Sequence, residues 1–304
     1  MASQRDVRNK INSVKNIQKI TRAMEMVAAA RLRRAEQRIE SLRPYAEGLR
    51  RMTQQAARAA GANAAQVSLL MAHEQETNVG LLLVTGDRGL AGGFNSQIIR
   101  AGVRIASELA EQRLNTHWYA SGRRGVSSVS FRGHELSGSY TGFADRPAFA
   151  DARTIADDLM QAYVDGSLDR VEIVYNSYVS PLTQRVTRET LLPVARAPFS
   201  ADEGAAIERA EAGERDGRPT PVEYEPDANE ILKRLVPDFV EISIYRALVE
   251  SAAGFFGAQM TAMRSASDNA GEILTDYTLQ MNRARQAEIT QEIMEVVAGA
   301  QGLS

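Results

Sequence analysis

A glycine-rich stretch in the first third of the chain has the residue types that bind phosphate. The sequence VTGDRGLAGGFNSQII, residues 84–99, follows an apolar run at 79–84 and precedes an amphipathic segment. It therefore joins a predicted strand to a predicted helix, where backbone N–H groups commonly bind nucleotide phosphates. Arg88 adds a cation that could meet such an anion. The first hypothesis is a phosphate cradle.

The spacing of this stretch argues against that hypothesis. A Walker loop ends in Gly-Lys followed by Ser or Thr. The chain has only four lysines, none of them near the loop: Lys10, Lys15, Lys19 and Lys233. A dinucleotide fingerprint has one residue between its first two glycines, whereas two residues separate Gly86 from Gly89. We expect a glycine-bent turn with a structural or interface role, and keep a nucleotide-binding α/β enzyme using the Gly86–Gly93 loop as the alternative.

The other residues that perform catalysis or bind metals form no recognisable pattern. The chain has no Cys, so it has no disulfide, thiolate zinc site or cysteine nucleophile. Its three histidines, His73, His117 and His134, lack the spacing of metal ligands and suggest no Ser-His-Asp triad. We predict no catalytic residue, no cofactor-binding residue and no metal site.

Two long helices are predicted at the ends of the chain. In the first, apolar residues recur in steps of three and four: Val7, Ile11, Val14, Ile17, Ile20, Met24, Val27, Ala28, Leu32, Ala35, Ile39, Leu42, Ala46 and Leu49. A second stripe runs from Tyr245 towards Val297, and Pro44 should kink the first helix or begin a new segment. Neither helix can bury its apolar stripe by itself. We therefore expect the two helices to pack on each other as a long antiparallel coiled coil.

The middle of the chain has a different pattern. A strand at 79–84, a helix at 95–114 capped by Asn95 and a strand at 116–121 form a predicted βαβ unit. A further helix at 147–166 precedes a hairpin made of 170–180 and 185–194. The fold class is therefore α/β, with a Rossmann-like domain inserted between the arms. The predicted domains are 1–58, 75–200, an acidic linker at 201–226, and 227–304.

Charge is strongly segregated along a chain whose net charge is only -2. Residues 1–58 hold fourteen Lys and Arg against five Asp and Glu, whereas residues 202–230 hold ten acids and three arginines. The basic arm favours an acidic partner or solvent. Nucleic acid is a weaker alternative, because aromatic residues are missing from this arm before Tyr45. No apolar run reaches the roughly 20 residues that span a bilayer, so membrane contact is expected only through partners.

The two arms resemble a known family. INSVKNIQKITRAMEMVAAARLRRAEQRI and LQMNRARQAEITQEIMEVVAGAQG look like the terminal helices of the γ subunit of the F-type ATP synthase, and GDRGLAGGFN is similar to a turn in that family's middle domain. The terminal signature is met at 289–301 and departs at Gly302. A second departure is SAAGFFGAQMTAMRSASDNA, residues 251–270, which is bulkier than the family's alanine-rich version.

The resemblance implies a non-catalytic rotor shaft. In this family the coiled coil stands within three α and three β subunits, and the middle domain rests with the ε subunit on the membrane c-ring. Proton flow turns the shaft, which drives the β subunits through their catalytic conformations. No cofactor is implied. The lack of a transit peptide favours the cytoplasmic side of a bacterial cell membrane, as a peripheral subunit.

The resemblance also suggests which residues contact other subunits. Met24 matches the family's methionine near the acidic lever of the β subunit, and the basic arm, including Arg33 and Arg34, suits that lever. A second set matches residues that contact a catch loop of the β subunit: Gln286, Thr290 and Glu292. Arg88 is the candidate in the glycine-rich loop. The uncharged final residues, 296–304, are expected to fray or to enter an apolar socket of a partner.

Overall fold

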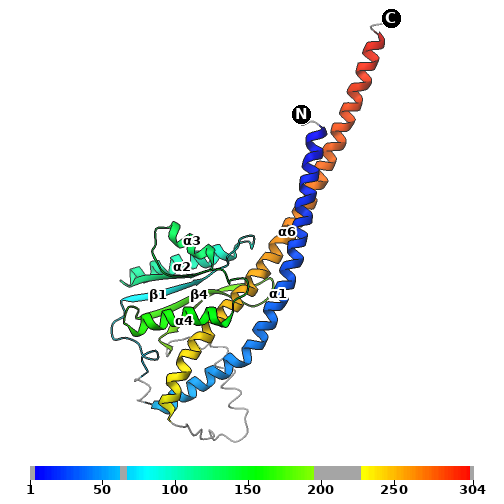
Figure 1. Ribbon diagram of the computed structural model, residues 1–304. Helices are drawn as coiled ribbons and strands as arrows, with labels where there is room; N and C mark the ends of the chain where they lie inside the picture. Colours follow the sequence, from blue (N-terminus) through cyan, green and yellow to red (C-terminus); the bar gives the residue numbers. More distant parts are fainter. Residues whose placement is uncertain (1–3, 62–66, 195–226, 302–304) are drawn as a thin grey trace. The chain divides into compact units, whose positions relative to one another are not determined.

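The computed structural model describes residues 4–61, 67–194 and 227–301 (Figure 1). Its helices are α1 (Gln4–Ala60), α2 (Phe94–Glu111), α3 (Arg123–Phe131), α4 (Phe149–Val164) and α6 (Ala228–Gln301). Its strands are β1 (Asn78–Val84), β2 (Asn115–Ser121), β3 (Leu136–Tyr140), β4 (Arg170–Tyr178) and β5 (Gln184–Leu192). The chain divides into two compact units: residues 1–30 with 259–304, and residues 31–258. The predicted acidic linker at 201–226 lies outside the described residues.

The first unit is an antiparallel helix pair. The order of contacts shows its direction: Glu25 meets Arg264, Gln18 meets Ser267, and Lys10 lies over the ring of Tyr277. As the residue number rises along α1, it falls along α6 at the next contact. The predicted long coiled coil of the two terminal helices is confirmed.

The contact seam differs from the predicted apolar stripe. In α1, less exposed positions from residue 7 to residue 28 recur in steps of four and three: Val7, Ile11, Val14, Gln18, Thr21, Glu25 and Ala28, with Met24 half-buried beside Glu25. This is the seven-residue repeat of a left-handed coiled coil. Ile17, Ile20 and Val27, which the apolar pattern placed in the seam, are 52%, 58% and 52% exposed. That assignment was wrong because polar Gln18 and Thr21 occupy seam positions.

The end of α6 extends past the described start of α1 (Figure 1). Lys10 lies over Tyr277 and α1 begins at Gln4, so the residues of α6 after Arg285 have no α1 residue opposite them in the described chain. Apolar side chains here are open to solvent, since Ile289 is 48% and Ile293 is 57% exposed. Within residues 4–61, 67–194 and 227–301, no segment of α1 accompanies this stretch of helix.

The second unit contains a five-stranded sheet in the order β3-β2-β1-β4-β5. β1 pairs in parallel with β2 and β4, β2 pairs in parallel with β3, and β5 is antiparallel to β4. Helices α2 and α3 cover one face of the sheet and α4 the other (Figure 1). This doubly wound arrangement confirms the Rossmann-like domain, with its topological switch point between β1 and β4.

Four details sharpen the predicted α/β domain. The β4–β5 hairpin is confirmed. Helix α3 and edge strand β3 were not predicted, because RRGVSSVSF and LSGSY are rich in Gly and Ser and lack a clear apolar period. Pro44 lies inside a continuous α1, so no new helix begins there. Asn95 is not a helix cap, since α2 begins at Phe94 after Gly93 without a side-chain capping bond.

Candidate functional site

The glycine-rich loop lies at the carboxyl end of β1, where open α/β sheets bind their ligands. Its anion is supplied by the chain itself. The Asp87 carboxylate accepts hydrogen bonds from the N–H groups of Arg123, at 3.0 Å, of Gly142, at 3.1 Å, and of Ala144, at 3.2 Å. The Arg123 N–H belongs to the first residue of α3, where a helix N-terminus attracts negative charge. The loop therefore contributes a carboxylate at this corner, and backbone donors from the start of α3 and from residues 142–144 bind it.

Asn95 closes the loop from the other side. Its Oδ1 accepts a hydrogen bond from the Gly86 N–H at 2.8 Å, and its Nδ2 donates to the Arg88 carbonyl at 3.0 Å. Leu90 adopts a φ of 63°, and Gly92 a φ of 54°, so the turn is bent twice through the left-handed region. The expectation of a glycine-bent turn agrees with this geometry, whereas the role of Asp87 was missed. An acid inside a glycine-rich loop was the available signal.

Arg88 is held by a single carboxylate outside the loop. Its Nε lies 3.5 Å from Asp145 Oδ2, and the same oxygen accepts from Arg31 Nη1 of α1 at 3.2 Å. The Arg88 side chain is 65% exposed, while the Asp145 side chain is 24% exposed. Asp145 thus lies between the loop and the helix α1.

The crevice at the switch point is filled by α6. Phe255 packs edge to face against Phe94 with ring centroids 5.6 Å apart. A Cβ added at Gly86 would lie 2.9 Å from Phe255 Cδ2, so glycine at this position leaves room for the Phe255 ring against the loop backbone. Ser251 of the same helix donates to the Val84 carbonyl at 3.4 Å.

The space left beside these groups is a cavity of about 10 Å³. That volume is at the lower limit for one water molecule, and a nucleotide base or phosphate is many times larger. The part of the chain that the structure describes therefore offers no nucleotide pocket at this loop. The geometry speaks against the alternative of a nucleotide-dependent enzyme at Gly86–Gly93.

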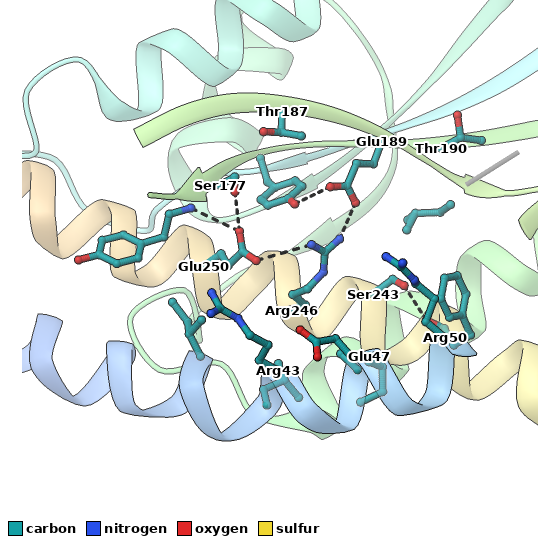
Figure 2. Close-up of a pocket in the computed structure, with 18 residues that line it drawn as sticks. Arg43, Glu47, Arg50, Ser177, Thr187, Glu189, Thr190, Ser243, Arg246 and Glu250 are labelled. Atoms are coloured by element: carbon teal, nitrogen blue, oxygen red, sulfur yellow. Dashed lines mark hydrogen bonds and ion pairs between the residues drawn. The ribbon is translucent and has the colours of Figure 1, made fainter. Parts of the chain in front are cut away.

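A larger cavity of about 350 Å³ lies between α1, the β4–β5 hairpin and α6 (Figure 2). Three of its charged residues form an ion-pair network. Arg246 of α6 lies 2.7 Å from Glu189 and 3.7 Å from Glu250, and Glu189 also accepts from the Tyr175 hydroxyl at 2.7 Å. Two carboxylates therefore already neutralise the central guanidinium. This network holds α6 against the hairpin.

Glu250 is a buried carboxylate in the lining of this cavity. It accepts a hydrogen bond from Ser177 Oγ at 2.8 Å and one from the Tyr178 N–H at 3.3 Å (Figure 2). Burial raises the pKa of Glu250 above its ordinary value of 4.5, even though Arg246 and these two hydrogen bonds favour the charged form. Desolvation is the larger effect at this position.

A second hollow, here called the basic groove, lies beside Asp145 in the same unit. It has a volume of about 350 Å³ and is lined by four arginines, Arg31, Arg34, Arg38 and Arg146. Among the described residues, only Arg31 of these four forms an ion pair. Arg34 is exposed and lines this groove, whereas Arg33 is exposed and does not line it. The groove is suited to an acidic segment.

The remaining predicted contact residues lie on the coiled coil. Met24 is half-buried on α1. Gln286, Thr290 and Glu292 are exposed on the part of α6 that extends past α1, and Thr290 Oγ1 donates back to the Gln286 carbonyl at 2.9 Å. The structure therefore groups these three residues on one unaccompanied stretch of helix. Side chains near the end of α6, including Glu295, lie outside the described residues.

The histidines have structural partners in place of a metal. His73 Nδ1 lies 2.9 Å from Asp169, His134 stacks on Trp118, and His117 lies 3.4 Å from Asn78. Within residues 4–61, 67–194 and 227–301, no group of three potential ligands could hold a metal ion. None of the helices in these ranges has a stretch apolar enough to span a bilayer.

Fold and site together define a class of protein: a two-helix shaft with an inserted doubly wound domain whose ligand crevice is closed by the shaft itself. A family model described as ATP synthase matches residues 3–303. The ATP synthase gamma chain of Rubrobacter xylanophilus is 42% identical over all of this chain and 99% of that protein. The gamma chain of Desulfitobacterium hafniense is 39% identical over the full length of both. The chain belongs to the ATP synthase gamma chain family.

Solved structures share the fold. A chain from the central stalk and c-ring structure of Tetrahymena thermophila mitochondrial ATP synthase aligns with a TM-score of 0.58 and 24% identity, over 82% of this chain and 99% of that one. A chain from Euglena gracilis mitochondrial ATP synthase aligns with a TM-score of 0.61 and 16% identity, over 99% of this chain and 94% of that one. The resemblance noted in the sequence is thereby confirmed.

Proposed function

We propose that this chain is the rotating central shaft of a proton-translocating F-type ATP synthase. It would stand within three α and three β subunits and bind the ε subunit and the membrane c-ring through its α/β domain. Rotation of the c-ring would turn the shaft, and the shaft would drive the β subunits through their conformational cycle in ATP synthesis or hydrolysis. Family membership is the basis of this proposal.

One structural observation supports it most directly. The coiled coil exposes apolar side chains on the outside of both helices. On α1, Met26 is 64% exposed beside Ile17, Ile20 and Val27; on α6, Met294 is 64% exposed beyond the end of α1. Scattered exposed apolar residues are ordinary, but a run of them along a two-helix coil is typical of a surface covered by another protein. A surrounding sleeve of subunits would cover both helices.

A non-catalytic role for the chain agrees with the site geometry. The glycine-rich loop carries its own anion, Asp87, which the Gly142 and Ala144 N–H groups bind, and Phe255 occupies the crevice beside the loop. Chemistry would then take place on other subunits. The shaft would transmit torque and impose its asymmetric shape on the surrounding subunits. It would bind no cofactor or metal.

The predicted contact residues remain part of this proposal. Met24, Arg33 and Arg34 would meet acidic lever loops of the β subunits. Of these three, Arg34 lines the basic groove, whose cations suit an acidic partner. Gln286, Thr290 and Glu292 would contact a catch loop at the free end of α6. Arg88, in the glycine-rich loop, would contact a neighbouring subunit. Through the c-ring the chain would lie at the cytoplasmic side of a bacterial cell membrane as a peripheral subunit.

Reconstitution tests the proposal. Purified α and β subunits are mixed with or without this chain, and ATP hydrolysis and the rotation of a bead on the chain are measured. We expect sustained hydrolysis and rotation only when the chain is present. Equal assembly and turnover without it would contradict the proposed function.

Charge reversal tests the basic arm within the same complex. We expect Arg33→Glu with Arg34→Glu to lower proton pumping per ATP hydrolysed in vesicles while leaving the chain folded, because both arginines are exposed. Arg104→Glu, an exposed arginine on α2, is the matched control. An unchanged pumping yield would remove these two residues from the proposed contact.

A further inference from the structure

The segment 251–257 of α6, within the stretch 251–270 singled out in the sequence, lies where this helix meets the α/β domain. Residues 251–257, SAAGFFG, are all buried. Small residues let this part of α6 approach the sheet: a Cβ added at Gly257 would lie 2.8 Å from the Pro181 carbonyl oxygen, and one at Gly254 would lie 3.2 Å from Gln184 and from Phe94. The two phenylalanines between these glycines point to different neighbours.

Phe255 enters the sheet side of this contact. It fills the switch-point crevice against Phe94 and Gly86, at the carboxyl end of β1. The Phe255 ring packs directly against the backbone at Gly86. Because protein interiors are closely packed, a displacement of this ring would also displace the loop.

Phe256 contacts α1. The guanidinium carbon of Arg31 lies 5.7 Å from the centroid of its ring, within the range of a cation–π contact. Arg31 also donates to Asp145, which holds Arg88 of the loop. A chain of contacts therefore runs from α6 through α1 to the glycine-rich loop and ends at Asp87, whose carboxylate is bound by the backbone of Gly142 and Ala144.

We propose that Phe255, Phe256 and Asp145 form a torque-transmitting joint that fixes the α/β domain to both shaft helices at the switch-point crevice. This inference rests on the proposed rotor function and deepens it. Torque applied to the α/β domain would otherwise bend the connection between domain and shaft. The three residues are positioning residues, since they act by holding helices and loop in register.

The test measures the stiffness of the rotor in the assembled complex. The α and β subunits are fixed to a surface, and a bead is attached to the α/β domain through Ser107→Cys, an exposed site on α2 in a chain that has no other Cys. The angular spread of the bead is recorded while the complex waits for ATP. Asp145→Asn, Phe256→Ala and Phe255→Leu are compared with the unaltered chain. Phe131→Ala, a phenylalanine that is 90% exposed in the same domain, is the matched control.

We expect a broader angular distribution for the three joint variants and an unchanged one for Phe131→Ala. Unloaded ATP hydrolysis should stay at its normal rate, whereas proton pumping per ATP in vesicles should fall. If Phe255→Leu prevents assembly, Asp145→Asn and Phe256→Ala decide the result. Unchanged spread and pumping in those two variants would overturn the joint. Absence of rotation with the unaltered chain would overturn the rotor function instead.

Discussion

Arg264 Nε of α6 donates to Glu25 Oε1 of α1 at 2.9 Å, across 239 residues of sequence. The same face of the pair carries a hydrogen bond from Gln18 to the Ser267 carbonyl and the contact of Lys10 with Tyr277. Thr21 and Ser267 are 8% exposed. Polar and small side chains thus occupy much of this seam, which brings the two helices close together and fixes their register.

Overpacking of this seam should destabilise the coil. Ala270 is 4% exposed, so Ala270→Leu inserts a larger side chain where no space exists and should cost about 1–3 kcal/mol of unfolding free energy. Its neighbour Asn269 is exposed, so Asn269→Leu should change stability by less than about 0.5 kcal/mol. Urea unfolding of the full chain measures both. Equal effects of the two substitutions would contradict the seam described here.

Removal of the Asp87 carboxylate should loosen the glycine-rich loop. Asp87→Ala leaves the N–H groups of Arg123, Gly142 and Ala144 without their acceptor, and should cost about 1–3 kcal/mol. Amide hydrogen exchange at Gly142 and Ala144 should accelerate. Asp157→Ala, an exposed acid on α4, serves as the control. Exchange rates that do not respond to Asp87→Ala would show that other acceptors hold this corner.

Nucleotides should not stabilise the isolated chain. A ligand at a hundredfold excess over its dissociation constant would add about 2.7 kcal/mol of stability. Because Phe255 and Asp87 already occupy the crevice and its donors, we expect ATP and NAD at millimolar concentration to leave the melting temperature unchanged in calorimetry. A rise that saturates with ligand concentration would restore the enzyme hypothesis.

Substitution at the end of α6 should separate function from stability. Glu292 is exposed on the stretch that has no α1 residue opposite it, so Glu292→Ala should change stability by less than about 0.5 kcal/mol. If Glu292 contacts the β subunits, ATP hydrolysis by the assembled complex should fall. Glu288→Ala, an exposed acid one turn earlier, is the control. Equal activity of both variants and the unaltered complex would exclude this contact.

Stability should depend on pH through Glu250. Its pKa in the folded chain is raised above 4.5, with burial as the main cause, while Arg246 opposes this shift and Glu189 adds to it. The folded state therefore binds the proton more tightly than the unfolded state, so stability falls as the pH rises from 4.5 through the raised pKa. Below that window the group contributes no pH dependence.

Glu250→Gln should remove this component. Urea unfolding at a series of pH values should show a shallower loss of stability for the variant than for the unaltered chain. Glu230→Gln provides a control, because Glu230 lies at the exposed start of α6 beside Lys233. If the Glu250→Gln curve runs parallel to that of the unaltered chain, the protonation of Glu250 does not contribute.

Periodicity predicted the large elements of the fold, and failed where apolar residues do not mark the contact. The two helical arms, strands β1, β2, β4 and β5, and helices α2 and α4 all have clear apolar patterns. The seam shift at Ile17 and Ile20 escaped this reasoning, because a stripe of apolar residues does not reveal which of its edges faces the partner helix. Edge strand β3 and helix α3 have no such stripe.

The candidate site was predictable only in part. The spacing of Gly86 and Gly89 and the distant lysines argued correctly for a structural turn. The occupant of the crevice could not be read from the sequence, because Phe255 lies far along the chain and its place depends on how α6 crosses the sheet. The departure at 251–270 marked the region without showing its partner.

Because Phe255 fills the crevice, a side chain of the same chain occupies the place where a ligand of an open α/β sheet would bind. A side chain of the same chain competes for the crevice at a fixed effective concentration, which does not fall when metabolite levels change. Changes in cellular nucleotide levels therefore have no direct route to this domain through the crevice at Gly86. The proposed shaft would therefore not respond, through this crevice, to the nucleotide that its partner subunits bind.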